Sequence, residues 1–192
     1  QATFKTIVDT LDRQLDYHIV GVTHDKDGIP QYKRSAFLRN SRDFGVPQNR
    51  PRVYIVAFSR AYFGQHISLL PEEAPTKRSR TPVFKSLADV LDKKVDSRFF
   101  LSSGYLDTLE KHIVTQHKKG YGFGYCIVNA PEIETPIANT LLATGGSGRE
   151  RNLIYDPING ASCAGTSIKG KYSPINDKFI RTMTPNEWGR LQ

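Results

Sequence analysis

The chain has 192 residues, of which 38% are hydrophobic and 24% charged, a composition that excludes a disordered protein. Lysine and arginine number 27 against 19 acidic residues, so the net charge of +8 and the pI near 9.5 favour a polyanionic partner, most simply nucleic acid. No apolar run approaches the roughly 20 residues that a membrane span needs, and we expect neither a membrane segment nor a signal peptide.

The first 60 residues predict the end of an α/β layer. Residues 3–15 carry apolar side chains at helical spacing, and Thr3 can cap that helix. Residues 17–22 predict a short strand, and a polar connection follows. The continuous β-branched and aromatic run at 53–58 is typical of a strand covered on both faces of an α/β sheet.

Three long polar side chains stand at spacing two just before this strand: Gln48, Arg50 and Arg52. Because side chains alternate along a strand, they would point to one side if the extended geometry reaches back that far. Pro47 and Pro51 lack amide donors and belong at the strand entrance. Such a cluster suits an anion or a planar polar ligand, and a surface ion-pair patch is the equal alternative.

Residues 61–80 are irregular and rich in proline, which predicts a connector between two folding units. Its basic run at 76–80 is more often a solvated face than a phosphate contact. A short helix is expected at 86–92, where Ser86 and Asp89 have capping-box spacing. A longer helix is expected at 103–118, with Gly120 ending it.

Two glycine-rich segments follow, and each allows two interpretations. Residues 118–128 alternate glycine and aromatics, which favours a hairpin that fills a small core over a nucleic-acid platform. Residues 140–157 predict two strands joined by a flexible tip. A loop that enters a DNA groove needs close backbone approach and bidentate arginines, although an ordinary exposed hairpin is slightly favoured. The candidate DNA contacts are Thr140, Gly145, Gly146, Ser147, Gly148, Arg149 and Arg151.

The chain closes with a strong helix start, in which Thr184 is the N-cap, Pro185 the first helical residue and Glu187 the third residue after the cap. Cys126 and Cys163 form no disulfide framework, so a reducing, cytoplasmic compartment is the expectation. The five histidines show no metal-ligand spacing, and no metal is expected.

Taken together, these segments resemble the C-terminal part of a bacterial DNA cytosine-5 methyltransferase. "QNRPRVYIV" is similar to that family's Gln-x-Arg-x-Arg motif, and "RTMTPNEWGRLQ" to its Arg-x-Leu-Thr-Pro-x-Glu-x-x-Arg-Leu-Gln helix, with Met183 in place of leucine. Thr140-Leu141 matches the Thr-Leu pair of the target recognition domain. "GYGFGY" resembles a segment of some members, including the Dcm-like ones.

The resemblance implies roles for these residues. Arg50 and Arg52, supported by Gln48, would hold the flipped cytosine and its phosphates, and the recognition segment would bind double-stranded DNA. The family uses a cysteine thiolate and S-adenosylmethionine. Its Pro-Cys dipeptide, Phe-x-Gly-x-Gly loop and Glu-Asn-Val motif are not in these residues. We therefore expect no cofactor bound to this piece, which should bind DNA without methylating it.

The implied fold is α/β: a partial Rossmann-like methyltransferase catalytic domain at 1–60, the connector at 61–80, a mixed α+β target recognition domain at 81–180 and a returning helix that starts at 181–192. We expect a cytoplasmic, nucleoid-associated monomer, either excised from a longer enzyme or paired with a missing catalytic half. A stand-alone DNA-binding protein without catalysis is the alternative, and a basic domain with no nucleic-acid function is a third interpretation.

Overall fold

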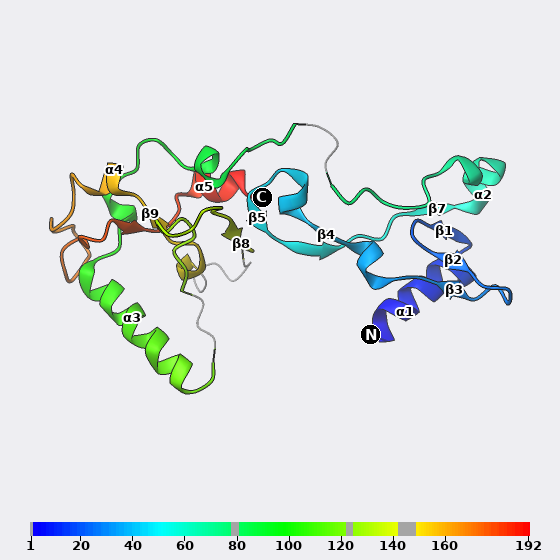
Figure 1. The fold of residues 1–192 in the computed structure, drawn as a ribbon, viewed down its shortest axis with the longest axis horizontal. Helices are drawn as coiled ribbons and strands as arrows, with labels where there is room; N and C mark the ends of the chain where they lie inside the picture. Colours follow the sequence, from blue (N-terminus) through cyan, green and yellow to red (C-terminus); the bar gives the residue numbers. More distant parts are fainter. Residues whose placement is uncertain (1, 78–80, 122–124, 142–148) are drawn as a thin grey trace. The chain divides into compact units, whose positions relative to one another are not determined.

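The computed structural model describes residues 2–77, 81–121, 125–141 and 149–192, and the chain divides into two compact units (Figure 1). Unit 1 comprises Gln1–Phe44 and Pro51–Arg80, and unit 2 comprises Gly45–Arg50 and Thr81–Gln192. Both units mix helices with short strands, in agreement with an α/β class. No helix among the described residues is long and apolar enough to cross a membrane.

Unit 1 is built from short elements around one small core. Its helical segments are α1 (Ala2–Asp9), η1 (Thr10–Gln14), η2 (Arg34–Phe37), η3 (Ser41–Phe44), α2 (Arg60–Phe63) and η4 (Gly64–Leu69). Its strands are β1 (Tyr17–Ile19), β2 (Thr23–His24), β3 (Pro30–Gln31), β4 (Leu38–Asn40), β6 (Pro51–Val53) and β7 (Ala57–Ser59). The pairs β1–β7, β2–β3 and β4–β6 are all antiparallel.

The predicted N-terminal helix is confirmed, although its second half winds more loosely than expected. The α-helix ends at Asp9, and η1 continues as a π-helix. Val8 is fully buried and packs with Ile19 and Phe37, and the rings of Phe4 and Phe37 meet edge to face at 5.1 Å between centroids. The apolar stripe thus anchors the helix on the unit 1 core.

The single strand predicted at 53–58, covered on both faces, is wrong. Residues 51–53 form β6 and residues 57–59 form β7, and the segment between them has no strand assignment. Val53, Tyr54 and Val56 are exposed by 56%, 59% and 42%. Among the described residues, β6 pairs only with β4 and β7 only with β1.

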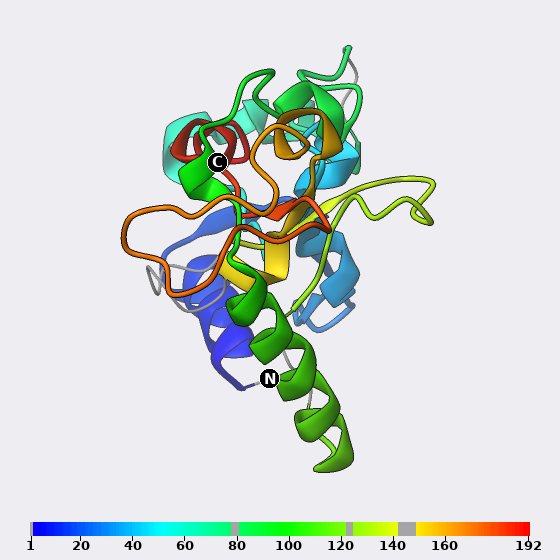
Figure 2. The ribbon, with the colours of Figure 1, turned by 90° about the vertical axis from the view of Figure 1, so that its left-hand side faces the viewer.

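Unit 2 carries its helical and strand elements around two principal apolar clusters. Its helical segments are η5 (Leu87–Val90), η6 (Ser97–Phe99), α3 (Ser103–Lys118), η7 (Arg149–Asn152), α4 (Pro157–Gly160) and α5 (Pro185–Arg190). Its strands are β5 (Gln48–Asn49), β8 (Ala138–Asn139), β9 (Ile154–Tyr155) and β10 (Ile180–Arg181). Strands β5 and β8 pair in parallel, β9 and β10 antiparallel. Residues 161–174 form a long irregular loop (Figure 2).

The helices expected in unit 2 are confirmed with one change of type. Helix α3 spans the expected residues and buries Leu106 and Leu109 against Leu101, Leu153 and Ile180. The helix expected at 86–92 is a short 3₁₀ turn, in which the Asp89 carboxylate accepts the N–H of Ser86 at 3.0 Å. Helix α5 starts as predicted, because Thr184 and Glu187 form a reciprocal capping box.

The pair of strands predicted over 140–157 is wrong: β9 is the one strand among the described residues of that range, and β8 ends before it at Asn139. Strand β8 pairs with β5, and β9 pairs with β10, so the two do not form a hairpin. Tyr125 packs against the cluster of Leu106 and Leu153, which favours the core interpretation for that aromatic side chain. Residues 122–124 and 142–148 lie outside the described residues.

Candidate functional site

The residues around Gln48 and Arg50 belong to unit 2, where strand β5 ends one residue before Arg50. Gln48 pairs with Ala138 and Asn49 with Asn139 in the parallel ladder. Gln48 and Ala138 are both fully buried, and the Ala138 N–H donates to the Pro47 carbonyl at 2.9 Å. Because Pro47 and Pro51 cannot donate hydrogen bonds, β5 is limited to two residues.

This ladder holds Thr140 beside Arg50. The Thr140 hydroxyl donates to the Asn49 carbonyl at 2.7 Å, one residue before Arg50. The Arg50 guanidinium is partly exposed and donates to the Gln192 side-chain oxygen at 3.0 Å. The structure therefore brings together two candidate residues that lie 90 positions apart in the sequence.

Two asparagines, Asn139 and Asn152, connect the segment that carries Thr140 to the segment that carries Arg151. The Asn139 N–H donates to the Asn152 side-chain oxygen at 2.6 Å, and the Asn139 amide group donates to the Arg151 carbonyl at 2.7 Å. Asn152 is buried, and its amide group returns a bond to the Asn139 carbonyl at 3.3 Å. The backbone at the exposed Arg151 is thus tied to the segment that carries Thr140. Sequence reasoning missed both asparagines, and the only signal was their position next to Thr140 and Arg151.

Arg52 belongs to unit 1, where it stands directly opposite Arg39 in the β4–β6 ladder. Arg39 donates to the carbonyls of Pro75 and Ala74 at 2.5 and 2.6 Å, whereas Arg52 is exposed and donates to the Pro51 carbonyl at 2.7 Å. Like charges at directly opposite positions of a ladder are destabilising, and a bound anion would offset this cost. Gln48 and Arg52 lie in different strands with different partners, so the expectation of one shared strand face is wrong.

A buried ion network supports the C-terminal part of this site. Arg181 is 1% exposed and forms a bidentate pair with Glu187, both bonds being 2.8 Å. It also donates to Asp156 at 2.7 Å. Burial alone would lower the pKa of Arg181, but the bonds with Glu187 and Asp156 raise it above its usual value. Arg181 therefore stays charged in the core of unit 2.

Some predicted residues cannot be placed. Gly145, Gly146, Ser147 and Gly148 lie outside the described residues, as does the side chain of Arg149, whose backbone starts η7.

Both cysteines pack with apolar clusters of unit 2. Cys163 is buried, its thiol donates to the Gly160 carbonyl at 3.4 Å, and burial raises its pKa. A protonated, buried thiol is a poor nucleophile.

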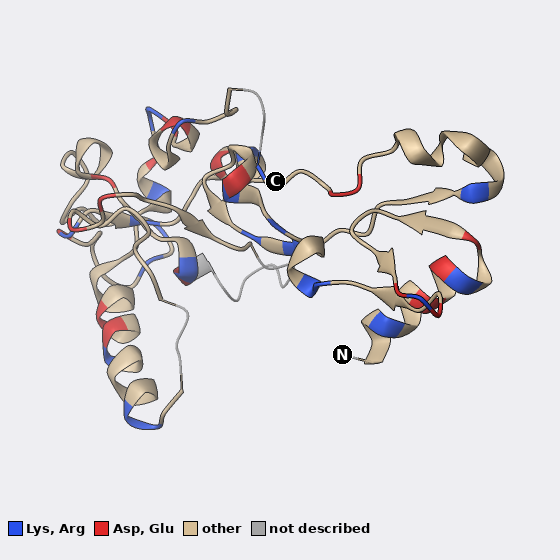
Figure 3. Ribbon diagram, turned by 45° about the vertical axis from the view of Figure 1, so that its right-hand side comes forward, with Lys and Arg blue, Asp and Glu red and all other residues tan. Residues whose placement is uncertain are grey.

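Charges are distributed along the elements of both units (Figure 3). Helix α3 carries Asp107 and Glu110 in its first half, so it does not present a uniformly basic face, and Lys118 in its last turn suits the helix dipole. Within the described residues, no group of three or more His, Cys, Asp or Glu is placed to hold a metal ion. The candidate arginines Arg50, Arg52 and Arg151 therefore lie outside α3 and do not belong to one basic helix.

Comparison with protein families matches residues 2–192 to the model for the C-5 cytosine-specific DNA methylases. The type II methyltransferase M.HpaII of Haemophilus parainfluenzae is 38% identical over 191 residues, which cover 99% of this chain and 45% of that protein. M1.ScrFI of Lactococcus lactis subsp. cremoris is 30% identical over 190 residues, which cover 99% of this chain and 38% of the relative. The chain thus spans less than half the length of these relatives.

A solved structure shares the fold. The methyltransferase EhMeth of Entamoeba histolytica superposes with a TM-score of 0.53 and 16% identity, over 98% of this chain and 45% of that one. At this identity the likeness concerns the fold alone. It extends over both units of the chain, which agrees with the family match along nearly the whole sequence.

Proposed function

Because the chain belongs to the C-5 cytosine-specific DNA methylase family, we propose that it is the DNA-binding and target-recognition part of a DNA (cytosine-5)-methyltransferase. The intact enzyme would transfer a methyl group from S-adenosylmethionine to carbon 5 of a flipped cytosine in a specific duplex site. In this proposal, residues 1–60 belong to the catalytic domain, 81–180 form the recognition domain, and 181–192 lead back to the catalytic domain.

The observation that carries this proposal is the parallel β5–β8 ladder. It joins the Gln-x-Arg segment to the Asn-Thr segment, and the bond from Thr140 to the Asn49 carbonyl locks their spacing. A group that holds a flipped base must keep a fixed position relative to the groups that read the neighbouring base pairs. Two residues in one ladder meet this requirement better than two residues on separate loops.

We assign Arg50 and Arg52 to the flipped cytosine and its flanking phosphates, with Gln48 in support. Guanidinium groups form bidentate bonds with phosphate and with polar base edges. Burial of Gln48 favours a role in shaping the strand from which Arg50 projects. Thr140, Arg149 and Arg151, with the glycine-rich residues 145–148, would contact the duplex, and the two arginines are the best candidates for base readout.

The 192 residues supply no Pro-Cys dipeptide and no Phe-x-Gly-x-Gly loop, so we infer that this chain alone does not methylate DNA. It would need a catalytic half that carries these motifs. One edge of the 51–59 segment pairs with β1 and β4, and no described residue pairs with its other edge. The exposed Val53, Tyr54 and Val56 beside that edge favour a further strand as the partner.

DNA binding tests the recognition part of the proposal. The purified chain would be titrated with a random-sequence duplex library at several salt concentrations, and bound sequences would be selected and read. We expect affinity to fall steeply with salt, and Arg50→Ala to reduce the salt slope by about one phosphate contact. Arg151→Ala should relax preference at one base pair by about 1–3 kcal/mol. Lys111→Ala, on the exposed face of α3, is the matched control.

A methyl-transfer assay tests the inference that this chain alone does not methylate DNA. With labelled S-adenosylmethionine and duplex DNA, the chain alone should incorporate no label above background. Turnover by the chain alone would contradict the inferred absence of the nucleophile. Affinity that is independent of salt and sequence would instead refute DNA recognition, so the two failures are distinguishable.

A further inference from the structure

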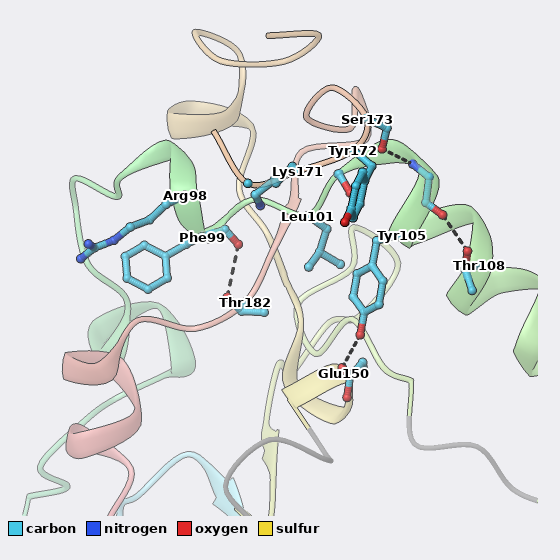
Figure 4. A pocket seen from close by; sticks show the side chains of 13 residues that line it. Arg98, Phe99, Leu101, Tyr105, Thr108, Glu150, Lys171, Tyr172, Ser173 and Thr182 are labelled. Carbon is cyan, nitrogen blue, oxygen red and sulfur yellow. Dashed lines mark hydrogen bonds between the residues drawn. The ribbon is translucent and has the colours of Figure 1, made fainter. Parts of the chain in front are cut away.

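Unit 2 contains a cavity of about 740 Å³ at the N-terminal end of α3 (Figure 4), and no residue of strands β5 and β8 lines it. Its lining comes from three parts of unit 2: Arg98, Phe99, Leu101, Ser102, Gly104, Tyr105 and Thr108; residues 170–173; and Glu150 and Thr182. A volume of this size accommodates a small organic ligand. Among the described residues assigned above, Gln48, Arg50, Arg52, Thr140 and Arg151 do not line this cavity.

A partly buried cation stands in this cavity. The Lys171 ammonium donates to the Phe100 carbonyl, a neutral acceptor, and burial lowers the pKa of Lys171. No carboxylate among the described residues lies within ion-pair distance of Lys171. A partly buried charge without a counter-ion is costly, and a bound anion would offset that cost. Arg98, whose guanidinium lies 5.0 Å from the centre of the Phe99 ring, adds a second cation to the lining.

The same cavity has an aromatic side. Tyr172 is fully exposed, and Tyr105 projects toward Glu150, to which its hydroxyl donates at 2.7 Å (Figure 4). Leu101, which is 7% exposed, adds an apolar side chain to the lining. Because the described structure gives Tyr172 no aromatic partner, its ring is available for stacking with a planar ligand. Hydroxyl groups of Ser102 and Thr182 add neutral hydrogen-bonding capacity.

We propose that this cavity binds a nucleotide, with the phosphate at Lys171 and the base against the ring of Tyr172. A carboxylate metabolite would use the cation but not the ring, and an uncharged aromatic compound would use the ring but not the cation. A phosphate joined to a planar base uses both. The same chemistry is present in a free mononucleotide and in a strand of DNA, and in the second case the site rests on the proposed DNA binding.

Calorimetric titration of the 192-residue chain with thymidine 5′-monophosphate tests whether Lys171 binds the phosphate. Lys171→Met should weaken binding by about tenfold or more, whereas Lys171→Arg, which keeps the charge, should retain most of it. Lys169→Met is the matched control, because Lys169 is an exposed lysine of the same loop that does not line the cavity. Equal binding by the Lys171→Met and Lys169→Met variants, or no binding of the nucleotide by the chain, would overturn the proposal.

Two further comparisons test whether the base stacks on Tyr172 and whether the ligand is a free nucleotide or a DNA strand. Tyr172→Ala should weaken nucleotide binding by about tenfold, and Tyr121→Ala, which removes another exposed ring outside the cavity, should not. Inorganic phosphate should bind more weakly than the nucleotide, and equal affinity would refute the role of the ring. Binding of an oligothymidine strand with the same dependence on Lys171 would assign the site to DNA, and binding of the mononucleotide alone would assign it to a free nucleotide.

These measurements are independent of the proposed DNA recognition. Loss of nucleotide binding in Lys171→Met, with unchanged salt dependence of duplex binding, would support the cavity site whether or not the recognition role holds. Failure of the duplex experiments with Arg50→Ala would refute the recognition role and leave the response of Lys171 to the mononucleotide as a separate result.

Discussion

Replacement of Glu187 by glutamine should destabilise unit 2 strongly. Each carboxylate oxygen of Glu187 accepts two hydrogen bonds, one from the Arg181 guanidinium and one from a backbone N–H, of Asp92 or of Thr184, all at 2.8 Å. Glutamine replaces one of these oxygens with an amide donor, so an Arg181 N–H and a backbone N–H both lose their acceptor. Arg181, which is 1% exposed, would then be balanced by Asp156 alone.

The expected loss is about 3–5 kcal/mol, the usual cost of breaking a buried ion pair by removal of one partner. A domain is typically stable by about 5–15 kcal/mol, so Glu187→Gln should leave unit 2 close to unfolding. The control is Glu110→Gln, because Glu110 pairs with Lys178 at 2.7 Å on the surface, where the two side chains are 42% and 55% exposed. That change should cost no more than about 1 kcal/mol.

Urea unfolding monitored by tryptophan fluorescence measures the loss of stability in both variants, Glu187→Gln and Glu110→Gln. Trp188 is the one tryptophan of the chain, and it lies in α5 next to Glu187, so its emission reports on unit 2. The double variant Arg181→Met/Glu187→Gln should lose less than the sum of the single changes, because the orphaned guanidinium is removed as well. Equal midpoints for Glu187→Gln and Glu110→Gln would refute the reasoning.

Three further predictions concern the stability of unit 2. The hydrogen bond from the Thr184 hydroxyl lowers the pKa of Asp92, so the contribution of Asp92 to stability should be complete above about pH 5 and be lost as the pH falls below about 4. Asp92→Asn should reduce this acid-induced fall in the urea midpoint. Gly45→Ala should destabilise unit 2, because φ is +84° and the new Cβ would lie 2.7 Å from another backbone carbon, whereas Gly189→Ala, in open space within α5, should stabilise it by up to about 1 kcal/mol in the same assay. Asn176→Ala should cost about 2–3 kcal/mol, because the buried side chain bonds three backbone groups at 2.7–2.9 Å, and protease resistance should fall with it.

Local signals in the sequence predicted local structure well. Helix α3 and the capped start of α5 follow from apolar spacing and from the Thr-Pro-x-Glu pattern, which act within a few residues. The ladder between β5 and β8 could not be predicted in the same way. Gln48 and Ala138 lie 90 residues apart, and two-residue strands leave no periodic pattern that would select their partner.

In the candidate site, too, the residue types could be predicted from the sequence but their long-range contacts could not. The residue types at Arg50, Arg52 and Thr140 were visible in the sequence, because a motif match identifies side chains without their surroundings. The asparagines that tie Thr140 and Arg151 together were missed, since a buried amide is recognised by its hydrogen-bond partners and not by its neighbours in sequence. The assignment of Arg52 to the same strand face as Gln48 failed for the related reason that each pairs with a different strand.

The strand run at 53–58 shows how a failed prediction can itself be informative. A continuous apolar run is selected by burial on both faces, yet Val53, Tyr54 and Val56 are largely exposed here, and Leu38, opposite Val53, is 50% exposed. Scattered exposed apolar residues are ordinary, but several on paired strands beside an open sheet edge mark an interface. The relatives matched by this chain are more than twice its length, and we infer that the complementary strand lies in the portion that the chain does not span. On this reasoning, Val53→Lys should weaken association with a co-expressed catalytic half and leave the thermal unfolding of the chain alone, followed by circular dichroism, unchanged, because Val53 lies in unit 1, on which Trp188 of unit 2 does not report. A parallel loss in both measurements would show that Val53 contributes to the stability of the chain and not to an interface.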